Sequence, residues 1–338
     1  MTIKRWTAIP LLTLLVLLFL IVSFAVGRYP IPPLTALAVL AGQVLPIAHD
    51  WPDQIGVVVL DIRLPRILAA LLVGAALSVS GAAYQGLFRN PMVSPDILGV
   101  SHGASVGAAL AILFGYGMLA IQFMAFAGGL VAVTATWIIG SAFGQRGDPV
   151  LVMVLAGVII GTLFGAFVSL VKFIADPNNT LPTITFWLMG SLASVNMDDL
   201  TGAAPPILAG IAGLIALSWP LNVLSFGEDE ARTMGLNTGR MRLLVITCAT
   251  LITATAVAIS GVVGLVGLVV PHLARMLVGP DHRVLIPVSA LMGGGFLLAV
   301  DDLARSLSEV ETPLGIVTAI IGSLFFIYLL GRTRRAWV

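Results

Sequence analysis

Residues 226–242 read FGEDEARTMGLNTGRMR and lie between two long apolar runs, Ile207–Leu224 and Leu243–Ile259. The stretch concentrates acidic and basic side chains in a chain that is only 10% charged. Charged loops stay in water, whereas long apolar helices cross lipid. The stretch therefore predicts a water-exposed loop between two membrane helices.

The same loop has the signals of a short helix. Three acidic residues, 228–230, stand where the positive end of a helix favours them. Gly235 is a helix stop that can adopt the left-handed conformation, and Asn237 or Thr238 can cap the next helix. Its apolar edge consists of Ala231, Met234 and Leu236. On these residues alone, two interpretations stay open: a solvated connector, or a helix that docks on a soluble partner.

Composition sets the class of protein. The chain has 338 residues, of which 59% are hydrophobic, and this predicts an all-α membrane protein with many spans. A net charge of +1 gives no reason to expect a nucleic-acid partner. The one cysteine, Cys248, excludes disulfide frameworks and cysteine zinc sites. No phosphate-binding G-x-x-x-x-G-K-[ST] motif surrounds Lys4 or Lys172, so ATP and magnesium are expected on another chain.

Long apolar runs predict ten transmembrane helices. The first is expected to be a retained span rather than a cleaved signal peptide. Arg28–Gln54 is expected to be an external loop, and Pro182–Ser194 a surface or half-depth helix. The expected spans are Ala8–Val26, Leu64–Leu87, Ile97–Phe114, Met118–Phe143, Val150–Ile174, Leu200–Pro220, Arg242–Ser260, Val262–Val278, Val284–Val300 and Pro313–Leu330.

The positive-inside rule places both termini in the cytoplasm. Outside then lie Arg28, Arg63, Arg66, Lys172 and Arg305. The other twelve of the 17 basic residues are cytoplasmic: Lys4, Arg5, Arg89, Arg146, Arg232, Arg240, Arg242, Arg275, Arg283, Arg332, Arg334 and Arg335. The group of spans two to five starts from the outside, and the group of spans seven to ten starts from the inside. The sequence therefore predicts an inverted repeat, a common transporter plan.

A series of motifs follows in order along the chain. They are RLPR at 63–66, GAAYQGLFRNP at 81–91, LGVS at 98–101, the loop at 227–237, GVVGLVGLVVPH at 261–272 with Arg275, and LGIVT at 314–318. Together, from about residue 60 to the end, they resemble the permease subunits of type II ATP-binding-cassette importers, the FecCD-type family for ferric siderophores, haem and cobalamin. Met92 and Leu265 stand where that family commonly has leucine and phenylalanine, which leaves the fold secure and the substrate open.

The resemblance implies a single permease domain over 1–338, in the bacterial inner membrane, without catalytic residues or metal ligands. It implies a homodimer with two cytoplasmic ATPase subunits and a periplasmic binding protein. Docking of the binding protein falls on Arg63 and Arg305, and Arg66 is expected to be structural. The coupling loop, 226–242, meets the ATPase through Glu228, Glu230, Ala231, Arg232, Met234, Gly235 and Leu236. The cytoplasmic gate falls on Asn90, Pro91 and Met92 and on Asp148, Pro149 and Val150.

Other functions stay open as alternatives. The same architecture could import an oxyanion such as molybdate or tungstate. An ion-coupled secondary transporter needs carboxylates within the membrane, whereas the acidic residues here are expected at helix ends and in loops. A membrane enzyme would need a cluster of reactive side chains, which the sequence does not suggest. His102 and His272 are expected to be structural, with a haem or metal ligand at His102 as the alternative.

Overall fold

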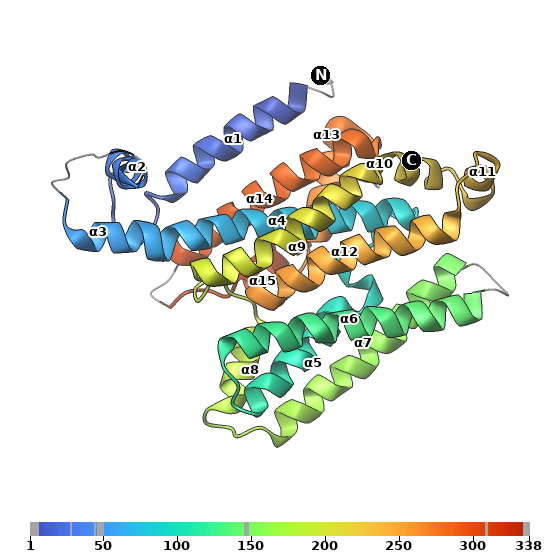
Figure 1. The fold of residues 1–338 in the computed structure, drawn as a ribbon, viewed down its shortest axis with the longest axis horizontal. Coiled ribbons are helices and arrows are strands. Elements are labelled where there is room, and N and C mark those ends of the chain that lie inside the picture. The colour runs from blue at the N-terminus through green and yellow to red at the C-terminus, as the bar shows by residue number, and fades with distance from the viewer. Residues whose placement is uncertain are drawn as a thin grey trace.

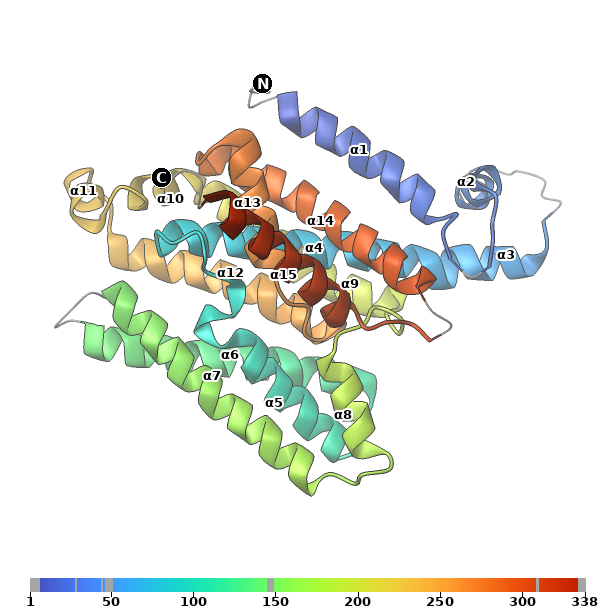
Figure 2. The same ribbon diagram turned by 180° about the vertical axis from the view of Figure 1, so that it is seen from behind.

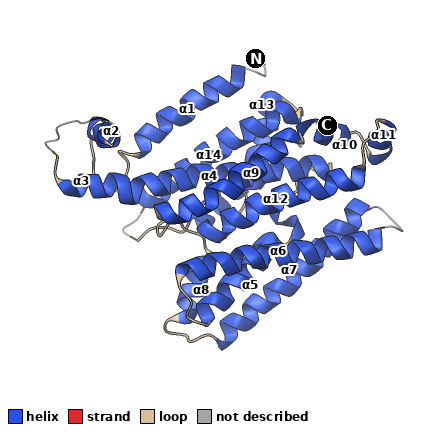
Figure 3. Ribbon diagram, viewed as in Figure 1, coloured by secondary structure: helices blue, strands red, loops and turns tan. Residues whose placement is uncertain are grey.

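The computed structural model describes residues 7–27, 29–43, 45, 51–144, 149–307 and 310–333, and all regular structure in them is helical (Figure 3). In chain order the elements are α1 Ala8–Ser23, α2 Pro33–Gly42, α3 Asp53–Val57, the π-helix η2 Val58–Arg63, α4 Leu64–Leu87, the 3-10 helix η3 Pro95–Leu98, α5 Val100–Leu113, α6 Met118–Phe143, α7 Pro149–Ile174, α8 Thr180–Leu188, α9 Met197–Ala216, α10 Ser218–Leu224, α11 Glu228–Thr233, α12 Thr238–Ser260, α13 Val266–Val278, α14 His282–Ser306 and α15 Leu314–Thr333.

Ten of these helices correspond to the expected spans. Among the described residues, six are long and apolar enough to cross a bilayer: the continuous helix Asp53–Leu87, α6, α7, α9, α12 and α14. The shorter apolar helices α1, α5, α13 and α15 complete the ten. The bounds of α4 and α6 are those that the sequence predicts.

The segment before α4 is more helical than expected. Part of the predicted loop Arg28–Gln54 forms α2, and the helix of α4 starts at Asp53 through α3 and η2. At 1.5 Å per residue, the 35 residues of that helix span roughly 50 Å, well beyond a hydrocarbon core of about 30 Å. A helix of this length cannot lie wholly within the hydrocarbon core. A π-turn, in which the Leu64 N–H bonds the Val59 carbonyl, joins the part before Leu64 to α4.

The α4 helix is the centre of the molecule and packs on α9, α12, α13 and α14. Small residues allow this contact, as the sequence pattern of Gly74, Ser78 and Gly81 suggests. A Cβ on Gly74 would stand 2.2 Å from the Gly293 carbonyl oxygen, and one on Gly81 would stand 1.8 Å from that of Gly267. Both positions therefore require glycine.

The contacts agree with two four-helix repeats, α4–α7 and α12–α15. The second helix of each is short, 14 residues in α5 and 13 in α13, and each follows a left-handed residue, Gly99 or Leu265. The α5 helix packs on α6 and α7 as α13 packs on α14 and α15, and α4 contacts α13 and α14 as α12 contacts α5 and α6. In Figure 1, α4 and α12 run in opposite directions.

The molecule has two ends along the helix axes. We call them the α11 end, which holds α11 and the turn between α13 and α14, and the α2 end, which holds α2, α3 and residues 310–313 (Figure 1). Seen from behind, α5, α7 and α8 form one group, and α13 and α15 lie in front of α4 and α12 (Figure 2). The predicted half-depth helix Pro182–Ser194 is α8, which packs on α5.

Candidate functional site

The coupling loop folds into α11 with the expected local signals. Gly235 has φ 81°, so it ends the helix in the left-handed region. The Gly235 N–H bonds the Arg232 carbonyl and the Leu236 N–H bonds the Ala231 carbonyl, which is the Schellman pattern. The Asn237 side chain then caps α12 by accepting from the Arg240 N–H at 3.0 Å. The sequence prediction of both caps is confirmed.

The α11 helix is held against its own chain on one side. Glu228 pairs with Arg242 and lies 3.5 Å from Arg232. Ala231 is 0% exposed and packs into the core, so it is not a surface that a partner can touch in this conformation. Its small side chain is needed for packing within the chain, which corrects the expectation that it faces the partner.

The exposed side of α11 has apolar side chains before and after the helix and charged side chains within it. Phe226 and Met234 are among the exposed large hydrophobic residues, and Glu230 and Arg232 are exposed as well. Leu236 is half-buried. The sequence motifs predict no separate role for Phe226, although a phenylalanine at the start of a charged loop is a signal for a contact site. An exposed face of this kind suits a protein partner.

Asn90, Pro91 and Met92 form an exposed turn at the α11 end. It follows a second Schellman motif, in which Arg89 has φ 50° and the Asn90 N–H bonds the Gln85 carbonyl. The Asn90 side chain accepts from the Met92 N–H at 2.9 Å, which fixes the turn. Of the other predicted gate residues, Val150 is half-buried against the main core, Pro149 begins α7, and Asp148 lies outside the described residues.

Arg63 and Arg305 both lie toward the α2 end, but their side chains turn into the chain. Arg63 is 4% exposed and donates to the carbonyl oxygens of Phe24 and Tyr29. Arg305 is 6% exposed, pairs with Asp302, and has its Nε 3.1 Å from the Asp301 carboxylate. Both arginines therefore have partners within the chain in this conformation, and their docking role stays a prediction.

These arginines belong to a larger buried group, the charge cluster, made of Ser23, Arg63, Arg66, Asp301, Asp302, Arg305 and Glu311. Arg66 lies 2.9 Å from Asp301 and 2.8 Å from Glu311, so it is structural as expected. The Ser23 hydroxyl donates to Asp302 at 2.6 Å. The cluster joins the end of α1, the start of α4 and the end of α14. Buried charges are stable only when paired in this way.

Most of the chain matches known permeases. A model of the FecCD transport family matches residues 14–332. The chain belongs to the FecCD transport family. This FecCD permease is therefore the membrane subunit of a type II ATP-binding-cassette importer, is not itself catalytic, and works with an ATPase that is a separate chain.

Individual relatives cover most of this FecCD permease. The molybdate import system permease protein MolB of Haemophilus influenzae is 40% identical over 324 residues, 96% of this chain and 95% of MolB. The cobalamin import system permease protein BtuC of Halobacterium salinarum is 43% identical over 305 residues, 90% of this chain and 80% of that protein. A solved structure, described as an inward-facing conformation of a metal-chelate type ABC transporter, has a TM-score of 0.85 and 39% identity, with 96% of this chain and 98% of that one covered.

One acidic residue of the FecCD permease stands at a helix start, as expected, but lies close to the packed spans. Asp96 is in η3, and the neighbouring Pro95 packs where α4 and α13 meet, because a Cβ on Gly267 would stand 2.4 Å from the proline ring. The Ser101 hydroxyl donates to the Asp96 carboxylate. A carboxylate therefore lies between spans, but the family places this chain in an ATP-driven importer rather than among ion-coupled carriers.

His102 lies beside α7, where a Cβ on Gly161 would be 3.5 Å from its Nδ1. Among the described residues, no group of three or more His, Cys, Asp or Glu could hold a metal ion. A metal site at His102 would thus lack partners within the described part of one chain.

A histidine with no role predicted from the sequence, His282, contacts α10 and α4 from the start of α14, near the coupling loop. His282 is 1% exposed. The backbone N–H of His282 donates to the Asn222 side-chain oxygen at 2.8 Å, and the ring Nδ1 of His282 lies 2.8 Å from the same oxygen. A Cβ on Gly86 of α4 would stand 2.3 Å from its Nε2. The α10 helix, which leads into α11, is thus joined to α14 and α4. In the sequence, Asn222 within an apolar run is the feature that could have indicated this contact.

Proposed function

We propose that two copies of this chain form the membrane part of an importer that carries a metal chelate, a ferric siderophore, haem or cobalamin, from the periplasm to the cytoplasm of a bacterium. Two ATPase subunits then bind at the α11 end and a periplasmic binding protein at the α2 end. The observation that carries the proposal is α11, a short helix fixed on one side and exposed on the other, in a chain of the FecCD family. Each copy acts as one permease domain.

Support for a metal chelate comes from the cobalamin permease of Halobacterium salinarum and from the metal-chelate type transporter structure. The alternative is molybdate or a similar oxyanion, and the similarity to MolB favours it. Both substrates fit the same architecture, so uptake measurements must separate them.

Docking of the binding protein is proposed over the charge cluster. Arg63 and Arg305 are buried, and we propose that they support docking indirectly. Arg63 donates to the carbonyl oxygens of Phe24 and Tyr29. Arg305 donates to that of Val26, and these bonds hold the connection between α1 and α2 in place. Glu311 is the member of the cluster with an appreciably exposed side chain. An unchanged affinity for the binding protein in Arg305→Gln would reject this assignment.

The orientation of the chain can be checked by cysteine labelling. In a Cys248→Ala background, Gly239→Cys and Met92→Cys should react from the cytoplasmic side and Asn178→Cys from the periplasmic side, because the first two lie at the α11 end. All three positions are exposed. A membrane-impermeant maleimide on intact and on opened cells measures this. Labelling of Asn178→Cys and Gly239→Cys from one side would break the topology, and Met92→Cys on the wrong side would remove the gate assignment.

The coupling role of α11 can be tested at Gly235, which is exposed and has no atom within 4 Å of a Cβ built there. Gly235→Ala and Gly235→Trp both place a side chain at φ 81° and share a backbone strain of about 1–3 kcal/mol. Tryptophan adds bulk toward the partner. We expect Gly235→Trp to lose coupled uptake on the order of tenfold relative to Gly235→Ala, which corresponds to about 1.4 kcal/mol of interaction.

The measurements are ATP hydrolysis and substrate uptake in the same vesicles, with Gly235→Ala as the matched control. Equal uptake in the two variants would mean that the ATPase does not contact this side of α11. Ala231→Trp would not separate these outcomes, because the buried Ala231 cannot accept a larger side chain without disturbing the fold.

A further inference from the structure

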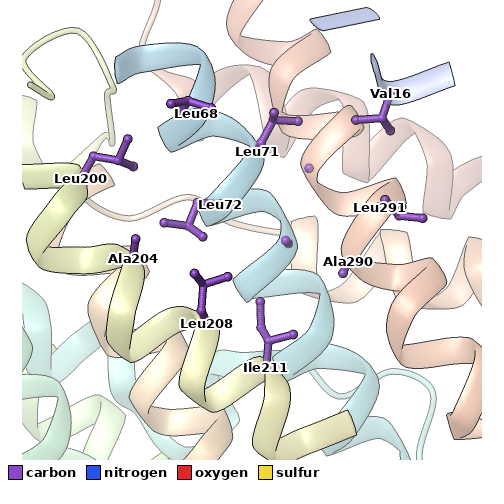
Figure 4. Close-up of a pocket in the computed structure, with 12 residues that line it drawn as sticks. Val16, Leu68, Leu71, Leu72, Leu200, Ala204, Leu208, Ile211, Ala290 and Leu291 are labelled. Carbon is purple, nitrogen blue, oxygen red and sulfur yellow. The ribbon is translucent and has the colours of Figure 1, made fainter. Parts of the chain in front are cut away.

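A groove of apolar side chains lies on the outer side of the helix bundle, away from the coupling loop. It has a volume of about 520 Å³ and lies between α1, α4, α9 and α14. Figure 4 shows leucine, isoleucine, valine and alanine side chains converging on it from these helices. The described residues that line it are Val16, Leu68, Leu71, Leu72, Ala75, Leu200, Ala204, Leu208, Ile211, Ala290, Leu291 and Gly294.

The groove exists because α1 is fixed at its two ends. At its start, Ala8 packs with Ala82, Val278 and Leu285 near the turn between α13 and α14. At its end, Ser23 and Phe24 bond Asp302 and Arg63 of the charge cluster. Between these points α1 lies along α14 (Figure 1), and the groove lies between α1, α4 and α9.

Three walls belong to helices long and apolar enough to cross a bilayer, and the fourth is the shorter apolar helix α1. It opens onto the lipid-facing surface, where Leu208 of α9 and Leu14 and Leu18 of α1 are exposed. Water would gain no hydrogen bond from the apolar side chains that line it, and a water molecule needs polar partners to occupy a cavity. The groove is therefore continuous with the interface between protein and bilayer, and what enters it must be apolar.

We propose that this groove holds an acyl chain of a bilayer phospholipid. The walls run from Leu68 and Leu200 near the α2 end to Ala75 and Ile211 near the middle, so the chain enters from the leaflet at the α2 end. Because the lining offers no charged or hydrogen-bonding side chain, the site selects the hydrocarbon chain and not the head group. The bound chain supports the middle of α1.

The test uses the intact chain in vesicles of phosphatidylethanolamine and phosphatidylglycerol. A trace of phosphatidylcholine with a diazirine in the middle of one acyl chain is added, and the sites of photo-labelling are mapped by mass spectrometry. We expect adducts on the groove residues of α4 and α9, with the same pattern when the diazirine is carried by phosphatidylglycerol. Ala204→Phe fills the groove from α9 and Ala290→Phe fills it from α14, and each should remove most of this labelling.

The matched control is Ala209→Phe, which adds the same ring to an exposed position of α9. It should leave the adducts in place. Labelling spread evenly over all exposed span residues, or unchanged in both groove variants, would overturn the proposal. So would a disulfide between two copies through Leu208→Cys, because a second protein chain would then cover the groove. If one groove variant fails to fold, the other variant and the map on the natural chain still decide.

Discussion

Vesicles that hold only the purified chain are expected to hydrolyse no ATP and to accumulate no substrate under a proton or sodium gradient. Uptake should appear when the ATPase subunit, ATP with magnesium and the loaded binding protein are all present. The chain lacks a phosphate-binding loop, and the FecCD family places ATP hydrolysis on a separate chain. The expected difference is between no uptake and full uptake, so its size is limited only by the background leak of the vesicles.

The control for this experiment is an ionophore that collapses the gradients, which should leave ATP-driven uptake unchanged. Binding proteins loaded with haem, cobalamin, a ferric siderophore or molybdate are compared in separate vesicles, and the one that supports uptake identifies the substrate. Molybdate uptake would replace the metal-chelate proposal by its alternative. Gradient-driven accumulation by the chain alone would contradict the importer assignment, and Asp96 would then be the first residue to examine as the coupling carboxylate.

The sequence predicted the features that depend on neighbouring residues. The ends of α4 and α6 follow from apolar length and from turn residues. The stop at Gly235 and the cap at Asn237 follow from short-range backbone chemistry. Helical spacing places the small residues Gly74 and Gly81 on one face of α4. Their partners Gly293 and Gly267 could not be predicted from the sequence.

What the sequence could not show depends on residues far apart in the chain. Arg63 meets carbonyl groups of the connection after α1, and Arg66 meets Asp301, more than two hundred residues away. Periodicity places an arginine at the end of a span but does not tell whether its charge faces solvent or a carboxylate. The inward side of Ala231 was hidden for the same reason, since three small or apolar edge residues fit either side of a short helix. The groove beside α1 arises from the path of α1, which local patterns do not fix.

Arg305→Gln is expected to destabilise the FecCD permease by roughly 3–5 kcal/mol, the usual cost of removing one partner from a buried ion pair. The substitution leaves Asp301, which is 0% exposed, with Arg66 as its partner, and it leaves Asp302 with Ser23. Glutamine can donate hydrogen bonds but supplies no positive charge. The free energy of unfolding, from titration with a denaturing detergent in mixed micelles, measures the effect.

The matched control is Arg283→Gln, an exposed position in the first turn of the same helix α14. An exposed substitution of this kind changes stability by about 0.5 kcal/mol or less. Affinity for the binding protein is then measured on the folded fraction of both variants. If the charge cluster supports docking, Arg305→Gln weakens binding while Arg283→Gln does not, since Arg283 lies at the opposite end of the helix. Equal stability of the two variants would contradict a stabilising role for the pairs of Arg305 with Asp301 and Asp302.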